Sequence, residues 1–264
     1  MTTAIAELDS LILLLEARIP ASQQSPQNLK RRERLERELR KYFRDLEKAF
    51  PYSKLAGIYN RYVKESLGSD SKNILDPLLA SFDEKLTADI AGQLAEIRIS
   101  GTAEVVTWGK TNAGVPIAYE GPPIQGAIDW AGKHSAALVK GMNEETINRL
   151  AHTISEGIKN KRGVPGLARD IKGTFADMTK HRSELIARTE TANALSEASL
   201  ETMKDMGIDG KEWVTVGDDR VSDDCLDNEA EGVIPTNQVF SSGAMAPPEH
   251  PSCRCALAPA GLSR

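Results

Sequence analysis

The chain contains only three cysteines and four histidines in 264 residues. A cysteine count that is both low and odd excludes a disulfide-rich scaffold and is typical of a protein made in a reducing compartment. Aromatic residues are also scarce, at 5% of the chain, although 40% of all residues are hydrophobic. The hydrophobic content is sufficient for a core, and a charged fraction of 27% is ordinary for a soluble protein.

Features of membrane proteins and of strongly basic nucleic-acid-binding proteins are missing as well. The apolar run from Leu11 to Leu15 is too short to span a bilayer. No basic segment precedes this run, so we expect no signal peptide and instead an amphipathic helix that begins near Thr3 and ends before Pro20. The net charge of −5 gives no general argument for nucleic-acid binding.

Most of the chain shows the hydrophobic periodicity of helices. Five residues between 30 and 50 are three or four positions apart and would form one apolar stripe: Leu35, Leu39, Tyr42, Leu46 and Phe50. The same spacing recurs over residues 71–99 and 124–206. Within the latter range we expect one helix to end near Gly141 and the next to begin with Asn143 as its N-cap. Residues 108–124, rich in glycine and proline, predict an extended connector between a helical N-terminal region (1–107) and a second domain (125–264).

The pattern changes after Gly207. Residues 211–216 alternate between polar and apolar and predict a strand. Residues 232–235 and 238–240 predict short extended segments, and residues 255–258 predict a closing strand. The predicted fold class is therefore α+β, with a predominantly helical body (including helices within 125–206) and a small β-rich module at 207–258. So small a module has little core of its own, and a metal cross-link would help to hold it together.

Four potential metal ligands are concentrated near the C-terminus. Cys253 and Cys255 follow His250 in a proline-rich segment, and Cys225 lies upstream in an acidic segment that we expect to be a loop. Together they form a Cys3His set, which is typical of structural zinc. Buried free thiols are a second interpretation, and a disulfide from Cys225 to either of the other cysteines is a third. Ser222 stands where a C-x2-C pair would have its first cysteine, and serine is a poor zinc ligand.

The segment from Lys30 to Lys48 has nine basic and five acidic residues. One interpretation is a face that contacts DNA or another anionic partner through the residues Lys30, Arg31, Arg34, Arg37 and Lys41. The interspersed glutamates favour the other interpretation, a solvated helix with ion pairs four residues apart, such as Glu33–Arg37 and Glu36–Arg40.

A catalytic function finds little support in the sequence. Seven acidic residues lie between positions 218 and 231: Asp218, Asp219, Asp223, Asp224, Asp227, Glu229 and Glu231. Two or three of them could bind a divalent cation, and the alternative function is therefore a metal-dependent nuclease that acts on DNA. However, their spacing matches no calcium-binding loop, the histidines form no H-E-x-x-H pair, and no phosphate-binding loop is present. We therefore expect no enzymatic activity.

The order of motifs from residue 125 to 258 resembles the Mu-F-like minor head proteins of tailed bacteriophages, the phage head morphogenesis family. The resemblance lies in Ile186-Ala-Arg-Thr-Glu190, in Trp213 on a strand, in Asp218-Asp-Arg-Val221 before Cys225, and in Pro247-Pro-Glu-His-Pro-Ser-Cys-Arg-Cys255. The motif residues with an expected structural role are Arg188, Glu190, Trp213 and Arg220. Arg188 and Glu190 could instead belong to an active cleft. We favour a structural anchor in which Glu190 accepts hydrogen bonds from backbone N–H groups or from Arg220.

The resemblance implies a virion component present in few copies. Such a protein would be made in the host cytoplasm and would lie in the head interior at the portal vertex, where it would affect procapsid assembly. The implied partners are the portal protein, the major capsid or scaffolding protein, and packaged double-stranded DNA bound without sequence specificity. No membrane partner is expected.

Overall fold

The computed structural model describes residues 19–62 and 70–261. The helix expected before Pro20 therefore lies outside the described residues. The chain divides into two compact units. The first unit comprises Met1–Arg34, Gly92–Trp130 and Leu185–Arg264, and the second comprises Leu35–Ala91 and Ala131–Glu184. Both units thus draw on residues from either side of the predicted connector.

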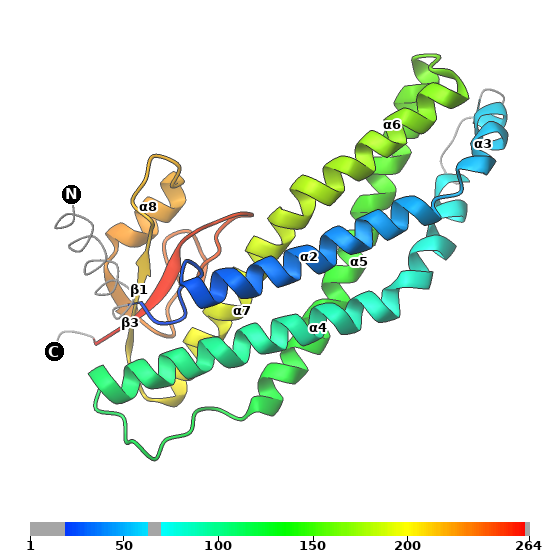
Figure 1. Ribbon diagram of the computed structural model, residues 1–264. Coiled ribbons are helices and arrows are strands. Elements are labelled where there is room, and N and C mark those ends of the chain that lie inside the picture. Colours follow the sequence, from blue (N-terminus) through cyan, green and yellow to red (C-terminus); the bar gives the residue numbers. More distant parts are fainter. Residues whose placement is uncertain (1–18, 63–69, 262–264) are drawn as a thin grey trace, which may run out of the picture. The chain divides into compact units, whose positions relative to one another are not determined.

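Long helices account for most of the described residues (Figure 1). In chain order the helical elements before the sheet are α2 (Pro26–Ala49), η1 (Tyr52–Lys54), α3 (Leu55–Tyr62), α4 (Asp70–Asn112), α5 (Ile124–Lys159), α6 (Gly163–Asp177), the π-helical turn η2 (Met178–Arg182) and α7 (Ser183–Asp205). Because α4 continues to Asn112, the predicted connector begins later than residue 108. No helix of the described residues is long and apolar enough to cross a membrane.

The apolar stripe predicted in α2 is confirmed, since all five of its residues are buried in the core of the second unit. Each fully buried side chain of this size stabilises the fold by roughly 1.5–3 kcal/mol relative to an exposed one. Phe50 at the end of the stripe packs edge-on against Phe175 of α6, with ring centroids 5.7 Å apart. Tertiary packing of one apolar face therefore supports the helix, as its periodicity indicates.

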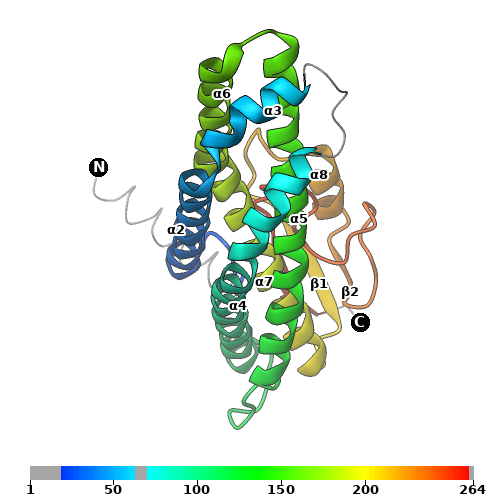
Figure 2. The same cartoon turned by 90° about the vertical axis from the view of Figure 1, so that its right-hand side faces the viewer.

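Helix α5 is continuous, and the predicted break between Gly141 and Asn143 was wrong (Figure 2). The Asn143 side chain caps no helix. Its Nδ2 donates to Asp83 Oδ1 at 2.7 Å, and its Oδ1 accepts from the Tyr42 hydroxyl at 3.3 Å. Apolar residues on both sides of the expected break, including Val139 and Met142, are buried. Burial of this face outweighs the local preference of glycine and asparagine for a helix end.

The π-helical turn η2 was not predicted from the sequence. It precedes α7 and directs the Arg182 side chain into the second unit, where it donates to Thr146 Oγ1 at 2.9 Å and to the Met142 carbonyl at 3.1 Å. The guanidinium also lies 5.5 Å from the centre of the Phe43 ring. Burial lowers the pKa of Arg182 to about 10, so the side chain is still charged at neutral pH.

The first unit contains a three-stranded antiparallel sheet in the order β2-β1-β3, formed by β1 (Gly210–Val214), β2 (Val233–Pro235) and β3 (Ala256–Ala260). Figure 1 shows β1 and β3 side by side, with α8 (Asp223–Ala230) next to β1. Trp213 pairs with Leu257 across the sheet and packs edge-on against Phe240, with ring centroids 5.1 Å apart. The α+β fold class is confirmed, although residues 238–240 form no strand.

Substitution of Gly141 by alanine tests the continuity of α5. An added methyl group at Gly141 would meet no atom within 4 Å. Alanine in a helix interior is favoured over glycine by roughly 0.5–1 kcal/mol, so we expect Gly141→Ala to raise the free energy of unfolding by that amount, measured by urea denaturation.

Gly207 provides the matched control. It follows α7 with φ of +71°, and its N–H donates to the Lys204 carbonyl at 3.1 Å. Because this conformation costs an L-residue about 1–2 kcal/mol, Gly207→Ala should be destabilising. A loss of stability in Gly141→Ala would instead indicate that α5 ends at this residue.

Candidate metal centre

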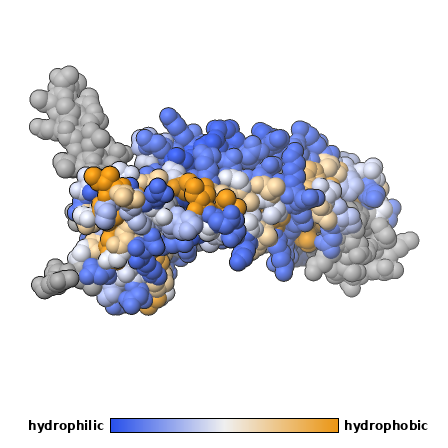
Figure 3. Space-filling view, turned by 90° about the horizontal axis from the view of Figure 1, so that it is seen from below, coloured by the Kyte–Doolittle hydropathy of each residue, from blue (hydrophilic) through white to orange (hydrophobic). Residues whose placement is uncertain are grey.

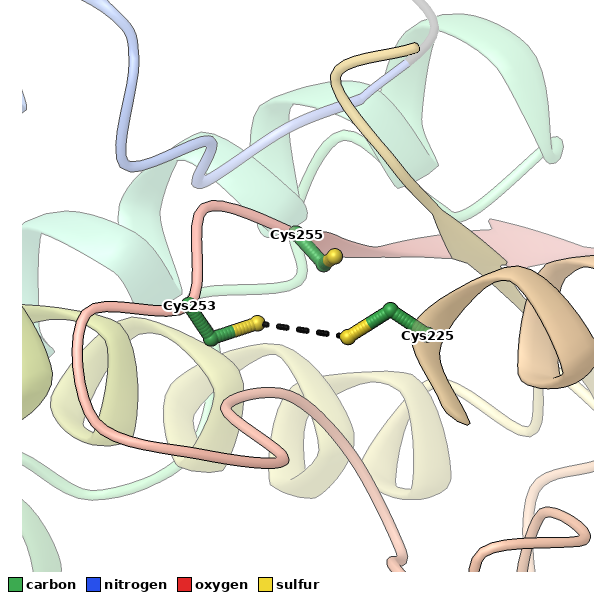
Figure 4. Close-up of side chains that lie close together, drawn as sticks. All are labelled: Cys225, Cys253 and Cys255. Atoms are coloured by element: carbon green, nitrogen blue, oxygen red, sulfur yellow. Dashed lines mark hydrogen bonds between the residues drawn. The ribbon is translucent and has the colours of Figure 1, made fainter. Parts of the chain in front are cut away.

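Three buried thiols converge in the first unit (Figure 4). Cys225 lies in the first turn of α8, Cys253 in the loop before β3, and Cys255 immediately before that strand. Their sulfur atoms all lie within 4.8 Å of one another, and the Sγ atoms of Cys225 and Cys253 are 3.8 Å apart. This separation is far longer than a disulfide bond of about 2.0 Å, and all three cysteines are free.

His250 lies beside the thiols and has a defined orientation. Its Nε2 is 3.7 Å from Cys225 Sγ, and its Nδ1 is 3.0 Å from the Pro251 carbonyl oxygen. A carbonyl can only accept a hydrogen bond, so this contact requires the proton on Nδ1 and leaves the Nε2 lone pair facing Cys225. A backbone carbonyl commonly orients metal-binding histidines in this way.

The distances around Cys225 suit a tetrahedral metal centre. With Zn–S bonds of about 2.3 Å and a Zn–N bond of about 2.0 Å, neighbouring ligand atoms of a tetrahedron are about 3.6–3.8 Å apart. The 3.8 Å contact to Cys253 and the 3.7 Å contact to His250 both match this spacing. A small cavity of about 20 Å³ has all four candidate ligands among the residues that line it. The three cysteines can therefore hold a metal ion, and His250, which lies close to Cys225 but outside the group of mutually close sulfur atoms, is the candidate for a fourth ligand.

Helix α8 positions Cys225, and the acidic loop predicted for this segment was wrong. Ser222 is the N-cap of α8, and its side chain accepts a hydrogen bond from the backbone N–H of Cys225 at 3.4 Å. The exposed Asp223 and Asp224 occupy the first turn, where the helix dipole favours negative charge. A serine followed by two aspartates is a helix-start signal, and it would have identified this helix. Ser222 thus has a structural role in capping.

Arg254, between the two C-terminal cysteines, anchors their loop. Its guanidinium makes two hydrogen bonds to the carboxylate of Asp218, at 2.6 and 2.5 Å. Asp218 also accepts from the backbone N–H of Arg220 at 3.1 Å. The Arg254 guanidinium lowers the pKa of Asp218 well below its usual range, because it stabilises the carboxylate.

The thiols differ in their tendency to ionise. A hydrogen bond from Cys255 lowers the pKa of Cys253 to about 5, whereas the neighbouring Cys253 and burial raise the pKa of Cys255. Burial also raises the pKa of Cys225. Without a cation, only one of the clustered thiols readily becomes a thiolate, because a second negative charge nearby is unfavourable. A bound cation would remove this penalty.

The Trp213 side chain lies close to the Cys255 thiol. Its indole N–H is buried and has no hydrogen-bond partner among the described residues. The same side chain favours the ionised form of Cys255, opposing the larger effects that raise its pKa. A metal-bound thiolate at Cys255 would give this buried N–H a charged group to face.

The acidic residues between 218 and 231 do not converge on a second cation site. Glu229 accepts from the backbone N–H and the hydroxyl of Thr215, both at 2.8 Å, and Glu231 accepts from the backbone N–H of Ser241 at 2.6 Å. Among the described residues, the three cysteines are the one cluster of potential ligands that lies close enough to hold a metal. Asp218, Glu229 and Glu231 instead act as hydrogen-bond acceptors for neighbouring segments.

The motif on α7 contacts the loop of residues 250–255, here called the metal loop, through one residue. Glu190 is buried and accepts from Asn193 Nδ2 at 3.1 Å, while the exposed Arg220 is paired with Asp218 at 3.2 Å. Thr189, which the sequence did not single out, accepts a hydrogen bond from the backbone N–H of Ser252 at 3.2 Å. This contact joins α7 to the segment between His250 and Cys253.

Two of the five candidate DNA-contacting residues already have acidic partners. Arg34 makes two hydrogen bonds to Glu96, at 2.5 and 3.0 Å, and Arg31 lies 3.7 Å from the same carboxylate. The predicted Glu36–Arg40 pair within α2 is present. Lys30, Arg37 and Lys41 are exposed. These pairs reduce the positive potential of α2, and the DNA-contacting face stays a prediction.

Part of the chain matches a known protein family. Residues 135–258 match the model of the family described as Phage Mu protein F like protein. The chain therefore contains a Mu-F-like segment. The resemblance in the order of motifs is confirmed, and the family match indicates a protein of phage head morphogenesis. No curated protein and no solved structure matches the chain in the corresponding searches. The Mu-F-like segment includes all four candidate ligands.

The ion pair between Arg254 and Asp218 predicts a pH-dependent contribution to stability. Because the folded-state pKa of Asp218 is lowered, its contribution is present above the unfolded-state pKa of about 3.9 and is lost as the pH falls toward the folded-state value. We expect Asp218→Asn to lower the melting temperature at pH 7, and the difference from the wild type to shrink below about pH 4.

Thermal denaturation between pH 3 and pH 8 measures this difference. Asp219→Asn, at the exposed neighbouring position, is the control and should show a smaller effect at pH 7. An equal effect of the two substitutions across this range would contradict a specific role of the Arg254–Asp218 pair.

Proposed function

We propose that this protein is a minor head protein of a tailed phage, which acts in head assembly at the portal vertex inside the procapsid. Its role is structural, and its Cys3His centre holds Zn²⁺. The observation that carries the proposal is the family match over residues 135–258, which spans the whole candidate metal centre. The protein would be made in the host cytoplasm and would enter the virion.

The ligand set favours a structural zinc ion over a catalytic one. Three thiolates and one imidazole fill all four positions of a tetrahedron and leave none for water or substrate. When bound, the ion would supply a cross-link between α8 and the loop that precedes β3. The strands have only three to five residues each, so a cross-link would add stability that their own core cannot supply.

The alternative of a metal-dependent nuclease has less support from the geometry. A nuclease would need several carboxylates directed at one cation with room for water. Asp218 is paired with Arg254, and Glu229 and Glu231 bind Thr215 and Ser241. These contacts favour a structural role for the three acidic residues, as partners in hydrogen bonds and ion pairs within the fold.

An exposed apolar surface supports docking to another protein. Ile117 is 88% exposed, Ile124 at the start of α5 is 58% exposed, and Ile128 one turn later is 47% exposed. Figure 3 shows that hydrophobic residues gather in separate patches on an otherwise largely hydrophilic face. A large contiguous patch of exposed apolar residues is typical of a protein interface. We assign these three isoleucines to the contact with the portal protein.

Elemental analysis of the purified protein tests the metal centre. We expect about one zinc ion per chain, as in other closed tetrahedral sites, and its loss in Cys253→Ser together with a lower melting temperature. Ser222→Ala is the matched control. It removes the cap of α8, at a cost of about 1 kcal/mol, but leaves the ligands intact and should retain zinc. A wild-type protein without stoichiometric zinc would refute the metal centre.

Co-expression with the cognate portal protein tests the proposed location. We expect the two proteins to co-purify, and the double substitution Ile117→Ser and Ile124→Ser to weaken the complex at least tenfold, measured by surface plasmon resonance. Val239→Ser, which alters an exposed apolar residue elsewhere, is the control and should leave binding unchanged. Failure of the wild-type protein to bind the portal ring would argue against the proposal.

A further inference from the structure

Gln23 lies in the segment before α2, and its side-chain amide contacts the metal loop. Although it is separated from that loop by 230 residues in the sequence, its Nε2 donates to the Cys253 carbonyl at 3.0 Å and to the Cys255 carbonyl at 2.9 Å. The residue is only 2% exposed. The two N–H groups of one buried amide thus donate hydrogen bonds to the carbonyls of the two cysteines that flank Arg254.

The two carbonyls determine the backbone geometry of the metal loop. They belong to the peptide groups on either side of the one that contains the Cys255 N–H. That N–H interacts with the Cys253 thiol. By fixing both adjacent peptide groups, Gln23 keeps the N–H directed at the sulfur. Contacts of this kind, which act on ligands from outside the coordination sphere, commonly determine metal affinity.

The segment that carries Gln23 is itself firmly held. The backbone N–H of Ala21 donates to Glu104 Oε2 at 3.0 Å, and Asn28 Nδ2 donates to the Ser22 carbonyl at 3.0 Å. Asn28 is fully buried and also contacts Glu104. Gln23 therefore joins a segment anchored on α4 to the loop that supplies two of the candidate ligands.

We propose that Gln23 is a positioning residue for the metal centre, and that metal binding and the anchoring of residues 19–25 stabilise each other through it. This inference rests on the proposed metal centre. It adds a contribution from outside the segment that matches the family, because Gln23 lies more than a hundred residues before residue 135. Coupling between two sites is reciprocal, so each should strengthen the other.

The zinc affinity of the full-length protein, measured by competition with a chromophoric chelator, tests whether Gln23 positions the metal centre. Gln23→Met keeps the length of the side chain but has no N–H group, and we expect it to weaken zinc binding roughly 10–100-fold. Gln24→Met, at the exposed neighbouring position, should bind zinc like the wild type. Circular dichroism verifies that both variants retain the helical fold.

Hydrogen exchange tests whether metal binding stabilises the anchoring of residues 19–25. A merely structural role of Gln23 would not make this exchange depend on zinc. In the wild type, removal of zinc by a chelator should accelerate exchange of the amides in residues 19–25. In Gln23→Met, exchange there should no longer depend on zinc. Unchanged zinc affinity in Gln23→Met, or exchange in the wild type that does not depend on zinc, would refute the positioning role alone. Absence of zinc from the wild type would refute the metal centre and this inference together.

Discussion

The arrangement of the C-terminal module depends on three buried sulfur atoms that lie within 4.8 Å of one another. Thiols packed this closely cannot all ionise without a cation, and a cation bound by all three would join α8 to the loop that precedes β3. The sheet has short strands and a small apolar core around Trp213 and Phe240. For such a module, a cross-link at the thiol cluster would add to the stability that strand pairing supplies.

The polar contacts around the cluster act on the same loop from several sides. Asp218, in the turn after β1, accepts hydrogen bonds from Arg254, and Gln23 donates to the carbonyls of Cys253 and Cys255. Thr189 of α7 accepts a hydrogen bond from the backbone N–H of Ser252. Each contact fixes backbone or side-chain geometry next to a candidate ligand. Pre-organisation of this kind lowers the conformational entropy that metal binding would otherwise have to overcome. It also explains why the acidic residues nearby are used as hydrogen-bond acceptors.

Local patterns predicted those parts of the fold in which side-chain periodicity and burial agree. The stripe from Leu35 to Phe50 is buried as its spacing indicates, and the alternation after Gly210 forms β1. Predictions were wrong where a local signal competed with tertiary packing. At Gly141 and Asn143 the signals for a helix end were outweighed by the burial of Val139 and Met142. At Ser222 the helix-start signal was present, but the serine was considered as a substitute for a cysteine.

The sequence by itself determined the helical body, the small sheet and the set of four potential ligands, because hydrophobic spacing and rare residue types are visible without coordinates. It also predicted, through the order of its motifs, the match of residues 135–258 to the Mu-F-like family. Only the tertiary structure showed that the three thiols lie close together, that Nε2 of His250 faces Cys225, and that Asp218 is paired with Arg254. It alone identified Gln23, because a hydrogen bond across 230 residues leaves no local pattern in the sequence.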